Sequence, residues 1–432
     1  MTIIQGGYIV NYKKRIIETK ITKKLKGKGA VLIEGPKWCG KTTTCEQFAK
    51  SSLYMADPTK RMQNIQLAQM NPALLLNGEV PRLIDEWQIA PNLWDAVRFE
   101  VDHRNEEGQF ILTGSSTPVK KDDIFHSGTG RFAWVTMRPM SLYESGESTG
   151  EVSIGDLFSQ KENISGTSKL SLNDIAFLAC RGGWPKATFM DEETSLEQAY
   201  DYYDSIIKND INEADGVIKD NERVKRLMKS YARNQGTQIS LSSIKEDIIA
   251  NDTDSLSEDT IYSYINALKK IFVIEDVSAW NPNIRSKTAI RTSDSRYFID
   301  PSIATAALGL GPNDLINDLK TFGLIFETLC MRDLKVYAES LEGNIYHYRD
   351  SSGLECDAVI HLRNGNYGLI EIKLGGEDLI NEGIKNLKDL NSKIDTTKMK
   401  NPSFLMVLTA IGDYAYKNED GVYIVPIGSL KN

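Results

Sequence analysis

Short apolar runs alternate with longer mixed stretches in the first third of the chain. The runs at 30–33, 83–84 and 110–112 each lead into a turn of glycine or polar residues. Continuous apolar runs are typical of strands that are buried on both faces of a parallel sheet, and the stretches between them fit connecting helices. The pattern predicts an α/β domain over residues 1–150.

The middle of the chain, residues 151–315, has the spacing of helices. A stretch rich in glycine and serine, 145–156, comes first, and Gly182 is a stop signal for the first helix. Ser255 and Glu258 have the spacing of a capping box before the last helix. The predicted helices cover 171–181, 195–211, 222–235, 240–249 and 255–272.

A predicted β-hairpin follows the last of these helices. Its strands, 272–280 and 296–300, flank a loop that carries Arg285, Lys287 and Arg291. Three helices and a β-wing with a basic tip predict a winged helix-turn-helix, for which DNA binding and a protein scaffold both stay open. Other basic residues that could contact phosphates are Arg223, Lys225, Arg226, Lys269 and Lys270.

The last region, residues 316–432, begins with a helical pattern and continues with strands. Two strand-like runs meet at Ser351–Gly353 and predict a hairpin, and a third run covers 367–374. Glu371 and Lys373 interrupt this third, otherwise apolar strand. Because residues two apart in a strand share a face, the acid and the base are expected to lie side by side.

Composition bounds the class of protein. The chain has 432 residues, 41% apolar and 25% charged, which fits two or three globular domains. Its apolar runs are shorter than a membrane span, its start lacks a signal-peptide pattern, and its five cysteines are scattered. We therefore expect a cytoplasmic protein with no membrane partner. The net charge of −8 argues mildly against nucleic acid, although local basic clusters remain.

The first apolar run leads into a phosphate-binding loop. Gly35 and Gly40 bracket four residues, and Lys41 and Thr42 follow, which is the P-loop pattern. Lys41 would reach the β- and γ-phosphates of ATP, and Thr42 would hold Mg²⁺. With the next residue, Thr43, and with Asp85 from a later strand, these residues form the predicted nucleotide-binding set.

Two later strand ends supply partners for this loop. Asp85 would complete the magnesium site, and Glu86 would orient the attacking water. After the run at 110–112, Ser115, with Thr113 as second choice, could sense the γ-phosphate. Arg131 is a candidate arginine finger for a neighbouring subunit in a dimer or a hexamer-like ring. A solvated arginine, and a plain polar turn around Ser115, are equally open alternatives.

Residues 15–145 resemble an AAA+-type ATPase domain. A narrower resemblance is to a group of prokaryotic predicted ATPases whose fused C-terminal region looks like a winged helix followed by a nuclease-like fold. The resemblance rests on the segments GPKWCGKTT, LIDEWQIAPNLWDAVRFEVD, FILTGSS, GTGRFAWVTMRPMSLYE and RGGWP. It implies an α/β ATPase domain, a winged-helix middle and a restriction-endonuclease-like C-terminal domain.

Acidic side chains of the last region could bind a metal ion. Glu327 lies in the helical pattern, Asp357 in the second strand, and Glu371 in the third. Carboxylates suit Mg²⁺, and Lys373 could position a water molecule and balance charge. An exposed Glu–Lys pair is the alternative. The pattern resembles the PD-(D/E)xK nucleases, although Cys356 stands where that family often has proline.

Together these features predict an ATP-hydrolysing protein that engages DNA, with ends or branched DNA as candidate substrates and a metal-dependent nuclease domain. The alternative is a nucleotide-dependent switch or scaffold whose C-terminal domain is a degenerate nuclease that binds a protein partner. Only the first hypothesis predicts that DNA stimulates ATP turnover.

Overall fold

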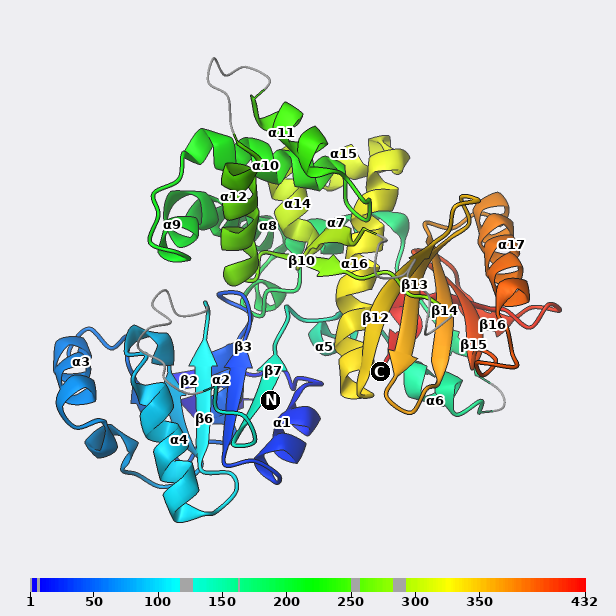
Figure 1. Cartoon of the computed structure of the whole chain (residues 1–432). Coiled ribbons are helices and arrows are strands. Elements are labelled where there is room, and N and C mark those ends of the chain that lie inside the picture. Colours follow the sequence, from blue (N-terminus) through cyan, green and yellow to red (C-terminus); the bar gives the residue numbers. More distant parts are fainter. Residues whose placement is uncertain (1, 6–7, 117–126, 162–163, 250–256, 283–292) are drawn as a thin grey trace.

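A parallel sheet forms the N-terminal part of the computed structural model (Figure 1), as the apolar runs predict. The strand order is β4-β5-β6-β3-β7. The structure describes residues 2–5, 8–116, 127–161, 164–249, 257–282 and 293–432. The elements of this part are β1 (Thr2–Gln5), β2 (Tyr8–Asn11), α1 (Glu18–Leu25), β3 (Ala30–Glu34), α2 (Lys41–Glu46), β4 (Ser51–Tyr54), α3 (Arg61–Met70), β5 (Arg82–Asp85), α4 (Leu93–Arg104), β6 (Phe110–Gly114) and β7 (Phe132–Thr136).

Separate cores cover the two faces of this sheet, because neighbouring residues of a strand point to opposite sides. Leu32 packs into one core with Trp94 and Val97 of α4. The adjacent Val31 packs into the other core with Ile21 of α1. Burial on both faces explains why these strands are continuous apolar runs.

Helices occupy the middle of the chain. At their centre α14 packs against α7, α8, α10 and α16. The helices are α7 (Leu172–Arg181), α8 (Glu192–Ser205), a π-helical segment (Ile206–Asp210), α9 (Ile211–Glu213), α10 (Asn221–Arg233), α11 (Leu241–Ile249), α12 (Glu258–Lys270), α14 (Pro301–Leu308) and α15 (Pro312–Asn317). Two short elements before α7, α5 (Leu142–Ser145) and α6 (Ile154–Phe158), connect this region to its neighbours.

Helix ends test the cap predictions. Gly182 ends α7, as expected, at a φ of 73°. The start of α12 differs from the predicted capping box, because Ser257 is the N-cap and its side chain accepts a hydrogen bond from the Thr260 N–H. Glu258 is therefore the first residue of the helix, and Ser255 lies outside the described residues.

The hairpin after α12 consists of β10 (Ile274–Val277) and β11 (Ser295–Phe298), which pair antiparallel. The predicted basic tip, with Arg285, Lys287 and Arg291, lies outside the described residues. The elements of a winged helix are thus present in the expected order, and the winged-helix assignment itself stays a prediction.

The C-terminal region is a mixed sheet with the strand order β12-β13-β14-β15-β17-β16-β9. β12 and β13 form the predicted antiparallel hairpin, whereas β14, β15 and β17 run parallel. Its elements are α16 (Leu319–Ser340), β12 (Gly343–Arg349), β13 (Glu355–Leu362), β14 (Tyr367–Lys373), α17 (Glu377–Lys393), β15 (Phe404–Thr409), β16 (Tyr414–Lys417), β17 (Tyr423–Pro426) and β18 (Leu430–Lys431).

Two short strands from the start of the middle region pair with strands near the end of the chain, one at the edge of this sheet and one in a separate two-stranded sheet. β9 (Gly166–Thr167) pairs with β16, and β8 (Val152–Ser153) pairs with β18. The segment 152–167, which we expected to belong with the helices, therefore lies beside the last strands of the chain.

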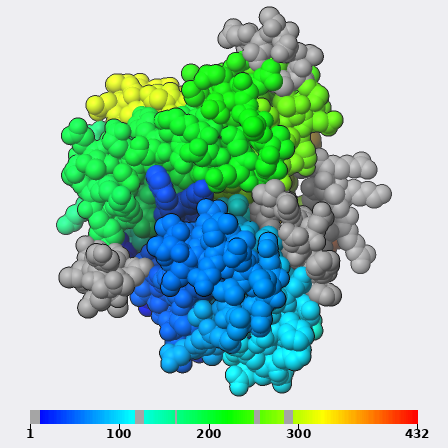
Figure 2. Space-filling model, turned by 90° about the vertical axis from the view of Figure 1, so that its left-hand side faces the viewer, coloured from blue at the N-terminus to red at the C-terminus, as the bar shows by residue number. Residues whose placement is uncertain are grey.

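Helix α16 stands between the helices of the middle region and the C-terminal sheet (Figure 1). Its Phe322 and Phe326 are fully buried in a core that also contains Ile303 of α14 and Ile370 of β14. One core thus serves both regions. The middle region, in green, also lies against the N-terminal domain, in blue and cyan (Figure 2). Within the described part of the chain, no helix combines the length and the apolar character that crossing a membrane requires.

Candidate active sites

The P-loop connects β3 to α2, and its two glycines are required by close contacts. A Cβ atom on Gly35 would lie 2.0 Å from the Met137 carbonyl oxygen. Gly40 has a φ of 94°, and a Cβ there would lie 3.3 Å from Pro185. A side chain at either position would therefore push the loop out of its present shape.

Lys41 is buried at the start of α2. Its Nζ donates hydrogen bonds to the carbonyl oxygens of Gly35, at 2.9 Å, and Pro36, at 2.7 Å. The ammonium group is thus held inside the loop, at the place where the pattern predicts phosphates. Phosphate oxygens could replace these carbonyl partners without an uncompensated loss of hydrogen bonds.

Thr42 and Asp85 meet across the P-loop, as predicted for a magnesium site. The Thr42 hydroxyl donates to Asp85 Oδ1 at 2.7 Å, and the Thr113 hydroxyl donates to the same oxygen at 2.6 Å. A hydroxyl and a carboxylate side by side are the hard oxygen ligands that Mg²⁺ prefers, so the residues fit this ion. Thr113 holds Asp85 in place from β6.

Glu86 and Ser115 also come together. Ser115 Oγ donates to Glu86 Oε2 at 3.0 Å, and Gln88 donates to the same oxygen. Glu86 has a φ of 54°, a left-handed conformation that is uncommon for residues other than glycine. The expected water-orienting acid and the expected sensor residue are therefore direct partners.

A single cavity of about 1380 Å³ contains these groups. Lys41, Thr42, Thr43, Glu86 and Ser115 line it. Its opposite wall comes from the middle region, with residues Trp184, Pro185, Lys186, Phe189, Met190 and Asp210. We did not predict this wall from the sequence, where RGGWP contributed only to the resemblance.

Arg131 lies away from this cavity. It precedes β7 at the strand end opposite the P-loop, and its side chain is 46% exposed. Its Nε donates to Asp102 at 2.7 Å. The structure therefore does not bring Arg131 to the P-loop of its own chain.

A second group of polar residues lies in the C-terminal sheet. Lys373 Nζ is 3.0 Å from Glu371 Oε2, which also accepts a hydrogen bond from Asn386 at 3.4 Å. Glu371 is only 1% exposed, and its Oε1 is buried without a hydrogen-bond partner. The acid and the base do share a face of β14, and they form a buried pair rather than an exposed one.

Asp357 lies on the neighbouring strand β13. Its Oδ2 accepts a hydrogen bond from the Ile372 N–H at 2.7 Å. Burial raises the pKa of Asp357, and burial together with the nearby Asp357 raises the pKa of Glu371 to about 8. Two carboxylates that disfavour each other's charge, one with an unpartnered buried oxygen, fit a site for a cation.

Glu327, on α16, is contacted by residues of the middle region. It accepts a hydrogen bond from the Tyr297 hydroxyl at 2.6 Å, and Gly236 lies so close that a Cβ there would be 2.4 Å from Oε1. Burial and Asp357 raise the pKa of Glu327 to about 8. Among the residues that the structure describes, no three acids, histidines or cysteines form a group that could hold a metal ion. The three predicted metal ligands therefore do not form such a group, although Asp357 lies close enough to Glu327 and to Glu371 to raise the pKa of both.

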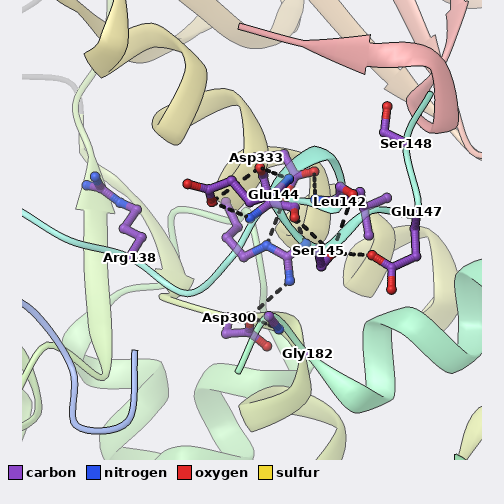
Figure 3. Close-up of polar contacts among 12 residues, drawn as sticks. Arg138, Leu142, Glu144, Ser145, Glu147, Ser148, Gly182, Asp300 and Asp333 are labelled. Carbon is purple, nitrogen blue, oxygen red and sulfur yellow. Dashed lines mark hydrogen bonds and ion pairs between the residues drawn. The ribbon is translucent and has the colours of Figure 1, made fainter. Parts of the chain in front are cut away.

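A buried polar network connects the regions (Figure 3). Arg15 pairs with Glu144 at 3.1 Å and also donates to the carbonyl oxygen of Cys39 in the P-loop. The Leu142 N–H donates to Asp333 at 2.9 Å, and Arg332 Nη1 is 3.0 Å from Asp300. These long-range contacts had no signal in the sequence.

Three known families match successive parts of this chain. Residues 27–146 match the AAA domain family, residues 172–314 a domain of unknown function (DUF8612), and residues 322–430 another (DUF4143). With the parallel sheet and the P-loop already described, the first match supports a P-loop ATPase-like N-terminal domain.

Relatives of similar length also match. The uncharacterized protein Rv2008c of Mycobacterium tuberculosis is 23% identical over 365 residues, which cover 84% of this chain and 74% of that protein. An uncharacterized protein of Haemophilus influenzae is 23% identical over 355 residues, which cover 77% of this chain and 80% of its own. Among solved structures, the Walker-type ATPase PABY2304 of Pyrococcus abyssi has a TM-score of 0.41 and 12% identity, covering 69% of this chain and 96% of that chain.

Proposed function

We propose that this protein binds and hydrolyses ATP and uses the nucleotide cycle to engage DNA. The observation that carries the ATP part is the meeting of Thr42 with Asp85 beside Lys41, in a cavity that also contains Glu86. These are the side chains that phosphoryl transfer requires.

Each residue has a distinct role in this mechanism. Lys41 exchanges its loop carbonyls for the β- and γ-phosphates, and the loop N–H groups bind the phosphate oxygens. Thr42 and Asp85 would hold Mg²⁺, which neutralises phosphate charge when bound. Glu86 accepts a hydrogen bond from the attacking water and orients it, while Ser115 fixes the Glu86 carboxylate.

The test is a nucleotide titration of Lys41→Ala beside the wild type. Lys41→Ala should lose measurable ATP binding, because it removes the buried ammonium group that would make charge-assisted hydrogen bonds to the phosphates. Lys50→Ala, a change between α2 and β4 that does not touch the cavity lining, is the control. Equal affinity of the wild type and Lys41→Ala would contradict the proposal.

The proposed DNA engagement depends on the middle and C-terminal regions. Some basic side chains of the middle region are already engaged, since Lys225 pairs with Glu222 at 2.8 Å and Lys269 pairs with Asp276. Phosphate contacts would have to compete with these pairs. The DNA part of the proposal therefore rests chiefly on Asp357, Glu371 and Lys373, which together fit phosphodiester cleavage.

In that reaction Asp357 and Glu371 would bind a divalent ion, which activates water when present. Lys373 positions the water and stabilises the charge that develops on the phosphate. The test is incubation with Mg²⁺ or Mn²⁺ and linear, nicked or branched DNA. Product that depends on the metal and disappears in Asp357→Ala supports a nuclease.

The second candidate function, a nucleotide-dependent switch or scaffold, is favoured by the buried network. Arg15 touches the P-loop, and Asp333 lies on the helix that carries Glu327, so nucleotide binding has a direct structural route to the C-terminal region. ATP turnover measured with and without DNA separates the candidates. Stimulation supports the DNA enzyme, and equal rates support the switch.

A further inference from the structure

The apex of the P-loop contacts the middle region through a buried acid. Lys37 Nζ is 2.7 Å from Asp210 Oδ1 and 3.4 Å from Glu213 Oε2. The Asp210 side chain is only 5% exposed, whereas that of Lys37 is 37% exposed. Lys37 therefore supplies the positive charge that pairs with the buried Asp210 carboxylate. Both residues line the nucleotide cavity.

Aromatic rings support the same contact. Trp38 has a φ of 67°, a conformation that a large side chain adopts only when its surroundings hold it. Its ring lies 5.4 Å from Tyr202 of α8, and Tyr202 lies 4.5 Å from Trp184. Two consecutive residues of the P-loop are thus fixed by α8 and the segment that follows it.

The backbone that presents Asp210 is unusual. The last turns after α8 form a π-helix over Ile206–Asp210, and Asp210 is its final residue. A π-helical turn inserts one residue per turn and so rotates the residues that follow it, and such turns occur frequently at functional sites. Here the irregular turn places a buried carboxylate opposite a lysine that is 173 positions earlier in the chain.

We propose that Asp210 is a positioning residue for nucleotide binding, which fixes the P-loop through Lys37 so that ATP affinity depends on how the middle region docks. This inference rests on the proposed ATP binding. The loop N–H groups face the phosphates only in one loop conformation, and the Lys37–Asp210 pair stabilises that conformation before the nucleotide arrives. Its loss should weaken affinity and leave the hydrolytic residues untouched.

The experiment is a double-mutant cycle on ATP affinity, measured by equilibrium titration of the full chain with a fluorescent ATP analogue. Lys37→Met and Asp210→Asn should each weaken binding by roughly tenfold, a typical size for coupling between sites. The double variant should be no weaker than Lys37→Met alone, because the Lys37–Asp210 pair is already lost in that single variant. The turnover rate at saturating ATP should change less than about twofold.

Controls separate positioning from folding. Lys208 and Asp204 form an exposed ion pair at 2.6 Å on the same stretch of helix, so Lys208→Met and Asp204→Asn should leave affinity unchanged. Lys37→Arg keeps the positive charge beside Asp210 and should retain most of the affinity. Thermal unfolding of each variant shows whether its fold is intact.

The outcomes are distinct. Failure of the wild type to bind ATP contradicts the proposed function itself. Wild-type affinity in Asp210→Asn, or additive losses in the double variant, overturns only the positioning role. A variant that unfolds is replaced by Lys37→Gln, for which the same tenfold loss of affinity is expected. Wild-type affinity in Lys37→Gln would overturn the positioning role.

Discussion

Thr42 and Asp85 are joined by a hydrogen bond of 2.7 Å, although 43 positions separate them in the chain. Parallel strands bring their carboxyl ends to one edge of the sheet, and Thr42, which follows β3, meets Asp85 at the end of β5 there. β6 lies between these two strands and contributes Thr113 to the same carboxylate. The arrangement of these side chains beside the P-loop is thus a consequence of the strand order.

Glu86→Gln should bind ATP normally and hydrolyse it at least about a hundredfold more slowly, because only the group that orients water is lost. Ser115→Ala should cause a smaller fall, since Gln88 still holds Glu86. Single-turnover measurements beside an ATP titration check both. Wild-type turnover in Glu86→Gln would refute the assignment of this acid.

Arg131→Ala should leave ATP affinity intact and, in an assembled oligomer, lower turnover on the order of 10³-fold, as expected for an arginine finger that acts on a neighbouring subunit. Mixing it with Lys41→Ala subunits should restore part of the activity. Arg98 pairs with the same Asp102 at 3.1 Å, so Arg98→Ala is the matched control. An assembled mixture without rescue would exclude action in trans.

Lys373→Ala should abolish DNA cleavage and change DNA affinity little, because the ammonium acts mainly in the transition state. ATP hydrolysis should persist, since the two sites lie in different regions. Lys388, which pairs with Asp420 on the surface at 2.6 Å, provides a control in Lys388→Ala. Gel assays on several DNA forms measure cleavage, and a full rate in Lys373→Ala would place the activity elsewhere.

Glu275 should stabilise the junction of the three regions in a pH-dependent way. Burial disfavours its charge, but Arg138 and Lys335 outweigh this effect and lower the pKa of Glu275 to about 2. The folded pKa lies below the unfolded one, near 4.3, so the stabilisation is present above that value and is lost as the pH falls toward 2. The loss is of the order of 2–3 kcal/mol.

The comparison of Glu275→Gln with the wild type tests this linkage. The variant should have a lower apparent unfolding temperature at pH 6, and the gap should narrow steadily toward pH 3. Glu222→Gln, which removes an exposed partner of Lys225, should show no such dependence. A gap that stays constant over this range would contradict the role of the carboxylate.

Local patterns predicted which polar side chains meet beside the P-loop, because these residues come at the ends of buried strands whose order is common to parallel sheets. The hairpin of β12 and β13 and the shared face of Glu371 and Lys373 could also be predicted, because each depends only on residues that are close together in the chain. The cap of α12 was misplaced by two residues, since Ser255 and Ser257 are both good capping residues and sequence spacing alone cannot choose between them.

Contacts between residues that are far apart in the chain could not be predicted from the sequence. β8 and β9 have only two residues each, too few for a periodic pattern, and their partners come at the end of the chain. The Lys37–Asp210 pair depends on a π-helical turn that no propensity indicates. The engagement of Glu327 by Tyr297 likewise follows from how two regions pack.

Helix α16 has a consequence for how this chain could change over time. Its 22 residues span about 33 Å, and they belong to the core of the middle region and to that of the C-terminal sheet at once. A gene fragment that began at residue 316 would include α16 and so remove part of the core of the helical region. A chain that stopped at residue 316 would leave the apolar residues that pack against α16 exposed. The C-terminal region is therefore poorly suited to transfer between proteins as a separate domain. We expect it to be gained or lost only together with the helices before it.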